Sequence, residues 1–228
     1  MNIVRGGIAL RGNGRLGRGA CVFPGGGTDS GAFREAINTI VLFLVAHAGR
    51  TPIHASAVMI GDRAIVLAGR SGSGKSSLAQ AADRAGLPVL SDDTVFVQVE
   101  PSFRVWGRTE AIHLREADVP AGVTGGIRIR AGRLKRALPV ARPRRNADQA
   151  LLCVIGQGGN FGLEPIQQEE AVRMLTEAPE PGFEFYGARS EEAVRAVAAG
   201  GCWRLTLSRD PDAAIAALIA AFSPQTGT

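Results

Sequence analysis

The chain has 228 residues and a formal net charge of +5, and its length suits one domain with or without an appendage. Its longest apolar run, residues 39–46, is far shorter than the ~20 residues of a membrane-spanning helix. The first residues carry glycine and arginine where a secretion signal has its apolar core, and the three cysteines lie far apart without metal-ligand spacing. We therefore expect a cytoplasmic protein without a membrane partner.

The positive charge has two explanations that the sequence leaves open. Nearly all of it comes from arginine, since lysine occurs only at Lys75 and Lys135, and a genome rich in arginine codons would produce this bias without any ligand. The local cluster RIRAGRLKR at residues 128–136 instead favours an anionic ligand. Because aromatic residues seldom alternate with basic ones and no nucleic-acid motif occurs, we expect no nucleic-acid partner.

The predicted elements follow one another as in a mixed α/β domain, without repeats or an obvious linker. Residues 1–30 are rich in glycine and indicate short strands and loops, and residues 30–50 predict a helix whose apolar run should be buried. Strands are predicted at 53–60, 63–69, 87–93, 94–100, 102–107, 150–156 and 202–208, and helices at 74–86, 167–178, 190–200 and 211–222. Residues 107–146 are rich in arginine and are expected to be irregular.

A phosphate-binding loop lies between a predicted strand and a predicted helix. The segment GRSGSGKS, residues 69–76, has a glycine, four free positions, a second glycine, a lysine and a serine. Glycines let backbone N–H groups turn toward phosphate oxygens, and the following helix adds the positive end of its dipole. Lys75 should reach the β and γ phosphates, and the Ser76 hydroxyl should hold magnesium. The residues predicted to bind ATP are Gly69, Arg70, Ser71, Gly72, Ser73, Gly74, Lys75, Ser76 and Ser77.

Three further residues are expected beside this loop. Gly61-Asp62 is a two-residue hairpin signal, so the strand that feeds the loop has an antiparallel partner, near whose start His54 lies. Asp92 and Asp93 follow the next strand and should lie at its carboxyl end. Two adjacent carboxylates repel each other unless a cation is near, and magnesium-bound phosphate supplies one. One carboxylate can bind the metal and the other can accept a proton from an attacking hydroxyl; the alternative is a solvated turn.

Together, His54, the hairpin, GRSGSGKSS, the helix and LSDD resemble the catalytic domain of the HPr kinase/phosphorylase family, which shares its core with phosphoenolpyruvate carboxykinase. The resemblance covers roughly residues 50–100. It implies a mixed-sheet P-loop kinase domain in which His54 lies close to the phosphates, Asp92 is the general base toward a serine hydroxyl and Asp93 assists with magnesium. Glu116 lies at about the place of a further metal-side acidic residue.

The resemblance is greatest to short kinase-like members of the family, some of which phosphorylate the C-terminal serine of a lasso-peptide precursor. It implies a single catalytic domain over residues 1–228, with N-terminal strands and a helix in 1–50, the nucleotide-binding core in 51–100 and the remaining sheet and helices in 101–228. Because full family members assemble into hexamers, a homo-oligomer is a further expectation.

The leading interpretation is an ATP- and magnesium-dependent kinase that acts on a serine hydroxyl of a small protein or peptide. Two alternatives stay open: a kinase for free serine or a sugar, and a nucleotide-binding sensor without turnover. The basic cluster could close over the phosphates or grip the peptide's carboxylate, or it could be a solvated loop. Its candidate residues are Arg128, Arg130, Arg133, Lys135 and Arg136.

Overall fold

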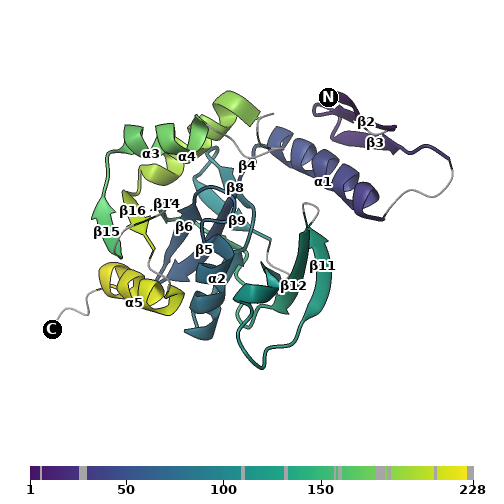
Figure 1. Ribbon diagram of the computed structural model, residues 1–228. Coiled ribbons are helices and arrows are strands. Elements are labelled where there is room, and N and C mark those ends of the chain that lie inside the picture. Colours follow the sequence, from purple (N-terminus) through teal and green to yellow (C-terminus); the bar gives the residue numbers. More distant parts are fainter. Residues whose placement is uncertain are drawn as a thin grey trace.

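The computed structural model describes residues 1–5, 7–25, 30–108, 111–130, 133–156, 158, 161–177, 183, 186–207 and 210–224. A six-stranded mixed sheet lies at its centre, with the strand order β15-β16-β14-β6-β5-β7 (Figure 1). These strands are β5 (Ala55–Ile60), β6 (Arg63–Ala68), β7 (Val89–Ser91), β14 (Ala150–Gly156), β15 (Gly162–Pro165) and β16 (Cys202–Thr206). The expectation of a mixed α/β fold around a mixed sheet is therefore confirmed.

The strand directions bring several strand ends to one edge of this sheet. β14 is parallel to β6 and to β16, whereas β5 is antiparallel to both β6 and β7. Two strands that are each antiparallel to β5 run in the same direction, so the carboxyl ends of β6 and β7 lie at one edge, together with those of β14 and β16. The amino end of β5 lies at that edge too.

Helices cover both faces of the central sheet, which explains why its inner strands β5, β6 and β14 are buried at nearly every position. α2 (Lys75–Arg84) and α5 (Pro211–Phe222) pack on one face against Ile65 and Leu67. α3 (Gln168–Thr176) and α4 (Gly187–Ala198) pack on the other face, where Val66 and Val154 are buried. Ile65 and Leu67 of β6 therefore contribute to the core on one face and Val66 to the core on the other, because successive side chains of a strand point to opposite faces.

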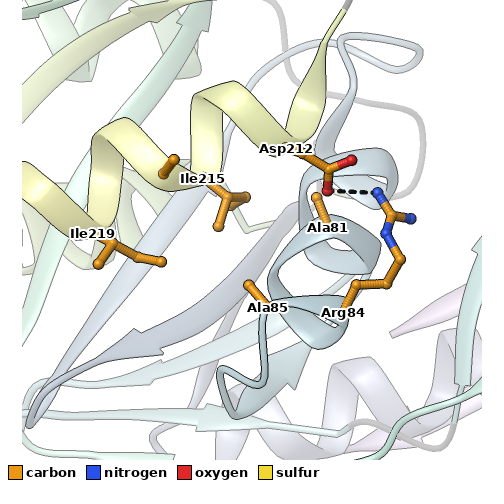
Figure 2. Close-up of a pocket in the computed structure, with 7 residues that line it drawn as sticks. Ala81, Arg84, Ala85, Asp212, Ile215 and Ile219 are labelled. Carbon is orange, nitrogen blue, oxygen red and sulfur yellow. Dashed lines mark hydrogen bonds and ion pairs between the residues drawn. The ribbon is translucent and has the colours of Figure 1, made fainter.

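An ion pair joins the two helices of the first face. Figure 2 shows a groove between α2 and α5 that is lined mainly by alanine and isoleucine, with Arg84 of α2 bound to Asp212 of α5. The Arg84 Nη2 to Asp212 Oδ1 distance is 2.7 Å. Asp210 caps α5, since its side chain accepts hydrogen bonds from the N–H groups of Asp212 and Ala213. These contacts fix α5 beside the helix that follows the phosphate loop.

A second sheet is antiparallel throughout and has the order β13-β9-β8-β4. Its strands are β4 (Thr51–Ile53), β8 (Val95–Gln98), β9 (Arg104–Gly107) and β13 (Asn146–Ala147). Val95, Val97 and Val105 point from this sheet into the core that α3 and α4 also enclose. β4 leads directly to β5, and β8 begins soon after β7. Short connections therefore join the second sheet to two strands of the central sheet.

The prediction of irregular structure for residues 107–146 was wrong. The segment holds a third sheet of order β10-β12-β11, formed by β10 (Ala111–Leu114), β11 (Gly126–Arg130) and β12 (Arg133–Pro139), with a 3-10 turn, η1 (Glu116–Asp118), after β10. The many arginines obscured the alternation in β10, whose Ile112 and Leu114 are buried with Leu138 in the core around α2, whereas Ile127 of β11 and Leu134 of β12 are exposed.

The N-terminal part has a small core of its own. β1 (Asn2–Arg5), β2 (Ile8–Asn13) and β3 (Arg18–Val22) form an antiparallel sheet that lies beside α1 (Ser30–His47) (Figure 1). Leu10, Ala36 and Ile40 are buried between this sheet and α1. The expectation that the run at 39–46 is buried was wrong for most of it: Ile40 and Ala46 are buried and the others are half-buried, because α1 covers only one small sheet. None of the described helices is long and apolar enough to cross a membrane.

Candidate active site

The β-strand register brings the three predicted elements of the site together. Ala55, the first residue of β5, pairs with Ala68, the last residue of β6, so His54 lies beside the start of the phosphate loop. Ser91, the last residue of β7, pairs with Ala57, so the chain then runs back along β5 toward His54. The Ser56 hydroxyl donates a hydrogen bond to the Asp92 carbonyl, and His54 Nδ1 lies 3.8 Å from Asp93 Oδ1.

The loop after β6 has the backbone of a phosphate cradle. Gly72 and Gly74 adopt left-handed φ angles of 82° and 104°, which side chains with a Cβ rarely adopt. A Cβ at Gly74 would also lie 2.8 Å from Leu207 Cδ1. Gly74 is the N-cap of α2 and provides no side-chain hydrogen bond to the first turn. The first N–H groups of α2 therefore need other acceptors, and phosphate oxygens suit them.

Lys75 and Ser73 are buried within the loop. The Lys75 ammonium donates hydrogen bonds to the carbonyl oxygens of Gly69 and Arg70, at 2.6 and 3.0 Å. The Ser73 hydroxyl oxygen is buried and has no hydrogen-bond partner among the residues that the structure describes. Leaving such a group unsatisfied costs about 1–3 kcal/mol. A phosphate oxygen would satisfy this hydroxyl and would offer the ammonium an anionic partner, so the loop fits the phosphates of a nucleotide.

The two carboxylates occupy different environments. Asp92 is buried, and its Oδ2 accepts a hydrogen bond of 2.8 Å from the backbone N–H of His113 on β10, whose Nδ1 lies 3.3 Å from the same oxygen. Asp92 Oδ1 is also buried but has no hydrogen-bond partner within the described ranges. The Asp93 side chain is 38% exposed and lies toward His54. Successive side chains at a strand end point in opposite directions, which explains the difference.

Sequence reasoning missed His113. Its contact with Asp92 joins residues that are 21 positions apart, since Asp92 follows β7 of the central sheet and His113 lies on β10 of the third sheet. The available signal was the alternation of AIHL, residues 111–114, in which Ile112 and Leu114 are buried. Recognising that alternation as a strand would have placed His113 on the face opposite to the buried residues, although it would not have identified Asp92 as its partner.

The structure pairs two residues that were predicted for different roles. Glu116, a candidate metal ligand, accepts hydrogen bonds from Arg136, a candidate for the phosphate clamp, and the Nε to Oε2 distance is 3.1 Å. This hydrogen bond lowers the pKa of the Glu116 carboxyl. Arg136 also donates to the Gly125 carbonyl. Among the described residues, no three histidine, cysteine, aspartate or glutamate side chains converge on a metal position; magnesium in kinases commonly uses one or two carboxylates plus substrate phosphates.

The predicted basic loop is a β-hairpin. Arg128 pairs with Lys135 and Arg130 with Arg133 in the backbone register of β11 and β12, and the side chains of Arg128, Arg130 and Arg133 lie outside the part that the structure describes. The hairpin shares its sheet with β10, which carries His113.

Comparisons with known proteins add little to this geometry. No family model matches the sequence, and the search of curated proteins gives no match. Among solved structures, the chain is similar to the HPr(Ser) kinase/phosphatase from Coxiella burnetii, with 13% sequence identity over 75% of this chain and 95% of that chain. The TM-score is 0.39, which is too low to carry an argument about function.

Proposed function

We propose that the protein is an ATP- and magnesium-dependent kinase of the HPr kinase type that transfers the γ-phosphate to a serine hydroxyl of a small protein or peptide. The observation that supports this proposal most directly is the meeting of the phosphate loop, His54 and the Asp92–Asp93 pair at one edge of the central sheet. A loop alone would support only nucleotide binding, whereas the adjacent carboxylates add groups that can act on an acceptor.

The nucleotide would be held by the loop. Its backbone N–H groups and the first turn of α2 would bind the phosphates, and Lys75 would exchange its carbonyl partners for phosphate oxygens. Ser76 and Asp93 would hold magnesium, which supplies charge neutralisation at the phosphates when bound. His54, placed between Asp93 and the loop, would lie close to the phosphates. Glu116 is a weaker candidate for the metal, because Arg136 already occupies its carboxylate.

Asp92 would act as the general base. Two His113 N–H donors can hold Oδ2, which leaves Oδ1 to accept the proton of the serine hydroxyl. In the transfer step, the serine oxygen forms a bond to the γ-phosphorus, the bond from that phosphorus to the β,γ-bridging oxygen breaks, and ADP leaves. The proton goes to Asp92 and then to solvent. General-base assistance of this kind typically contributes about 10²–10⁴-fold in rate.

The β11–β12 hairpin is the candidate for contact with the transferred phosphate or the acceptor. Arg136 is engaged by Glu116, so the proposal rests on Arg128, Arg130, Arg133 and Lys135. These four residues would together supply positive charge for an anionic group. A lasso-peptide precursor, whose acceptor serine is its last residue and carries the terminal carboxylate, is one candidate.

The experiment that tests this proposal is an acceptor screen with magnesium and ATP. Serine-containing peptides, free serine and sugars are incubated in parallel, and products are identified by mass spectrometry. We expect one added phosphate on a peptide serine. Turnover confined to free serine or a sugar would contradict the peptide assignment, and tight nucleotide binding without transfer to any acceptor would indicate a sensor.

A further inference from the structure

Two arginine side chains contact one tryptophan on the second sheet, away from the residues assigned above. The Arg50 guanidinium carbon lies 4.0 Å from the centre of the Trp106 ring, and that of Arg104 lies 5.5 Å from it. Arg50 follows α1, whereas Arg104 and Trp106 belong to β9. Alternation along β9 places these two residues on the face opposite to Val105, which is buried in the core.

Backbone and side-chain hydrogen bonds hold this cluster in place. The Arg50 N–H donates to the Val45 carbonyl at the end of α1, at 3.1 Å. The Trp106 indole N–H donates to Gln98 Oε1 at 3.2 Å, and the Gln98 amide donates to the Ser102 carbonyl. Gln98 pairs with Arg104 across β8 and β9, and Arg50 lies one residue before the pair that joins β4 to β8. The two arginines therefore flank Gln98 in a fixed arrangement.

Among the residues that the structure describes, no carboxylate is in contact with the two positive charges of this cluster. Within the described ranges, no ion pair joins Arg50 or Arg104 to an acidic residue, although Arg84, Arg195 and Arg204 all have such partners. Arg104 Nε is moreover buried without a hydrogen-bond partner in this part of the chain. The other N–H groups of the two guanidinium groups match a planar carboxylate, which is the best-matched acceptor for them.

We infer that Arg50, Arg104 and Trp106 form a docking site for an acidic peptide segment. Single-stranded nucleic acid binds open aromatic faces on which bases stack, and here the Arg50 guanidinium covers a face of Trp106. A carboxylate needs only the exposed N–H groups of the guanidinium. The positive charge of the two arginines and the covered face of Trp106 together favour a peptide rich in glutamate or aspartate as the ligand.

The site is close enough to the active site to serve an acceptor. β4 connects Arg50 to His54, and an extended strand rises roughly 3.3 Å per residue, so the separation is about 13 Å along the chain. This inference deepens the proposed function and rests on the acceptor being a peptide: a bound acceptor would have acidic residues about four or more positions from its serine.

The test is a binding titration without nucleotide. In a Trp203→Phe background Trp106 is the only indole of the chain, and its fluorescence is followed while an oligo-glutamate peptide is added. We expect saturable binding that weakens as salt rises, and about tenfold weaker binding for Arg50→Gln and for Arg104→Gln. Arg63→Gln is the matched control, because Arg63 is an exposed arginine at the far end of β6. Oligo-lysine, inorganic phosphate and a single-stranded RNA are the comparison ligands.

If Arg50→Gln and Arg104→Gln both bind oligo-glutamate with wild-type affinity, the proposed docking site is wrong. Tighter binding of phosphate or RNA than of oligo-glutamate would overturn the ligand assignment. Arg50 is exposed, so Arg50→Gln should fold and can test the site even if Arg104→Gln does not fold. Oligo-glutamate binding should persist in Lys75→Ala. Transfer to a non-acidic serine peptide should persist in Arg50→Gln, so failure of the docking site and failure of the kinase proposal give different results.

Discussion

Replacing His113 by leucine tests how Asp92 is held. The substitution removes the imidazole and leaves the backbone N–H, so Asp92 Oδ2 loses one of two donors. Hydrogen bonds to charged groups contribute roughly 1.5–3 kcal/mol. The lower end applies, because the 3.3 Å separation between Nδ1 and Oδ2 is long and the 2.8 Å backbone bond remains. A loss of about 1.5 kcal/mol in the transition state corresponds to roughly tenfold in kcat.

Steady-state kinetics with a peptide acceptor and a separate ATP titration measure this effect. We expect kcat to fall while ATP affinity stays unchanged, since the loop and Lys75 hold the phosphates. His113→Asn is the matched variant, because its amide can donate from about the place of Nδ1, and it should recover most of the rate. A leucine variant with a kcat within twofold of wild type would refute the reasoning, and a parallel loss of ATP affinity would show a general structural role instead.

Three further predictions concern the loop and the metal. Lys75→Ala should abolish detectable ATP binding by calorimetry, since the only other lysine is Lys135 and arginine is too bulky to replace a point charge; wild-type affinity would show that the loop assignment is wrong. Asp93→Asn should raise the magnesium concentration needed for half-maximal turnover several-fold, and complete inactivity at every magnesium concentration would indicate that Asp92 and Asp93 have exchanged roles. Gly74→Ala should lower stability by about 1–3 kcal/mol in denaturant unfolding, because of its φ of 104° and the 2.8 Å approach to Leu207; an unchanged midpoint would contradict this.

The centre of the fold was predictable from sequence because its signals are local. Gly61-Asp62 between two apolar runs fixes a hairpin, and the loop chemistry requires a strand before Gly69 and a helix from Lys75. Given those elements, the register alone places His54 and Asp93 beside the loop. The position of His54 follows from the local hairpin, whereas that of Asp93 also depends on the pairing of β7 with β5, which are far apart in the chain.

The remainder depended on contacts between residues far apart in the chain. The β10-β12-β11 sheet was missed because burial of Ile112, Leu114 and Leu138 in the core around α2, rather than the composition of an arginine-rich segment, anchors it. The pairing of Glu116 with Arg136 joins η1 to β12, and no local pattern indicates it. The burial of the run at 39–46 was overestimated, since an apolar run does not reveal that its helix covers only one small sheet and leaves Phe33 and Ile37 exposed.

Transfer of labelled phosphate by wild type and Asp92→Asn tests the central claim most directly. Asparagine keeps the size of the side chain but cannot accept the proton of the acceptor hydroxyl. With γ-labelled ATP, magnesium and a serine peptide, we predict label on the peptide serine for wild type, about 10²–10⁴-fold less for Asp92→Asn, and equal ATP affinity for both. Equal labelling by the two proteins, or label released only as inorganic phosphate, would contradict a kinase that uses Asp92 as its base.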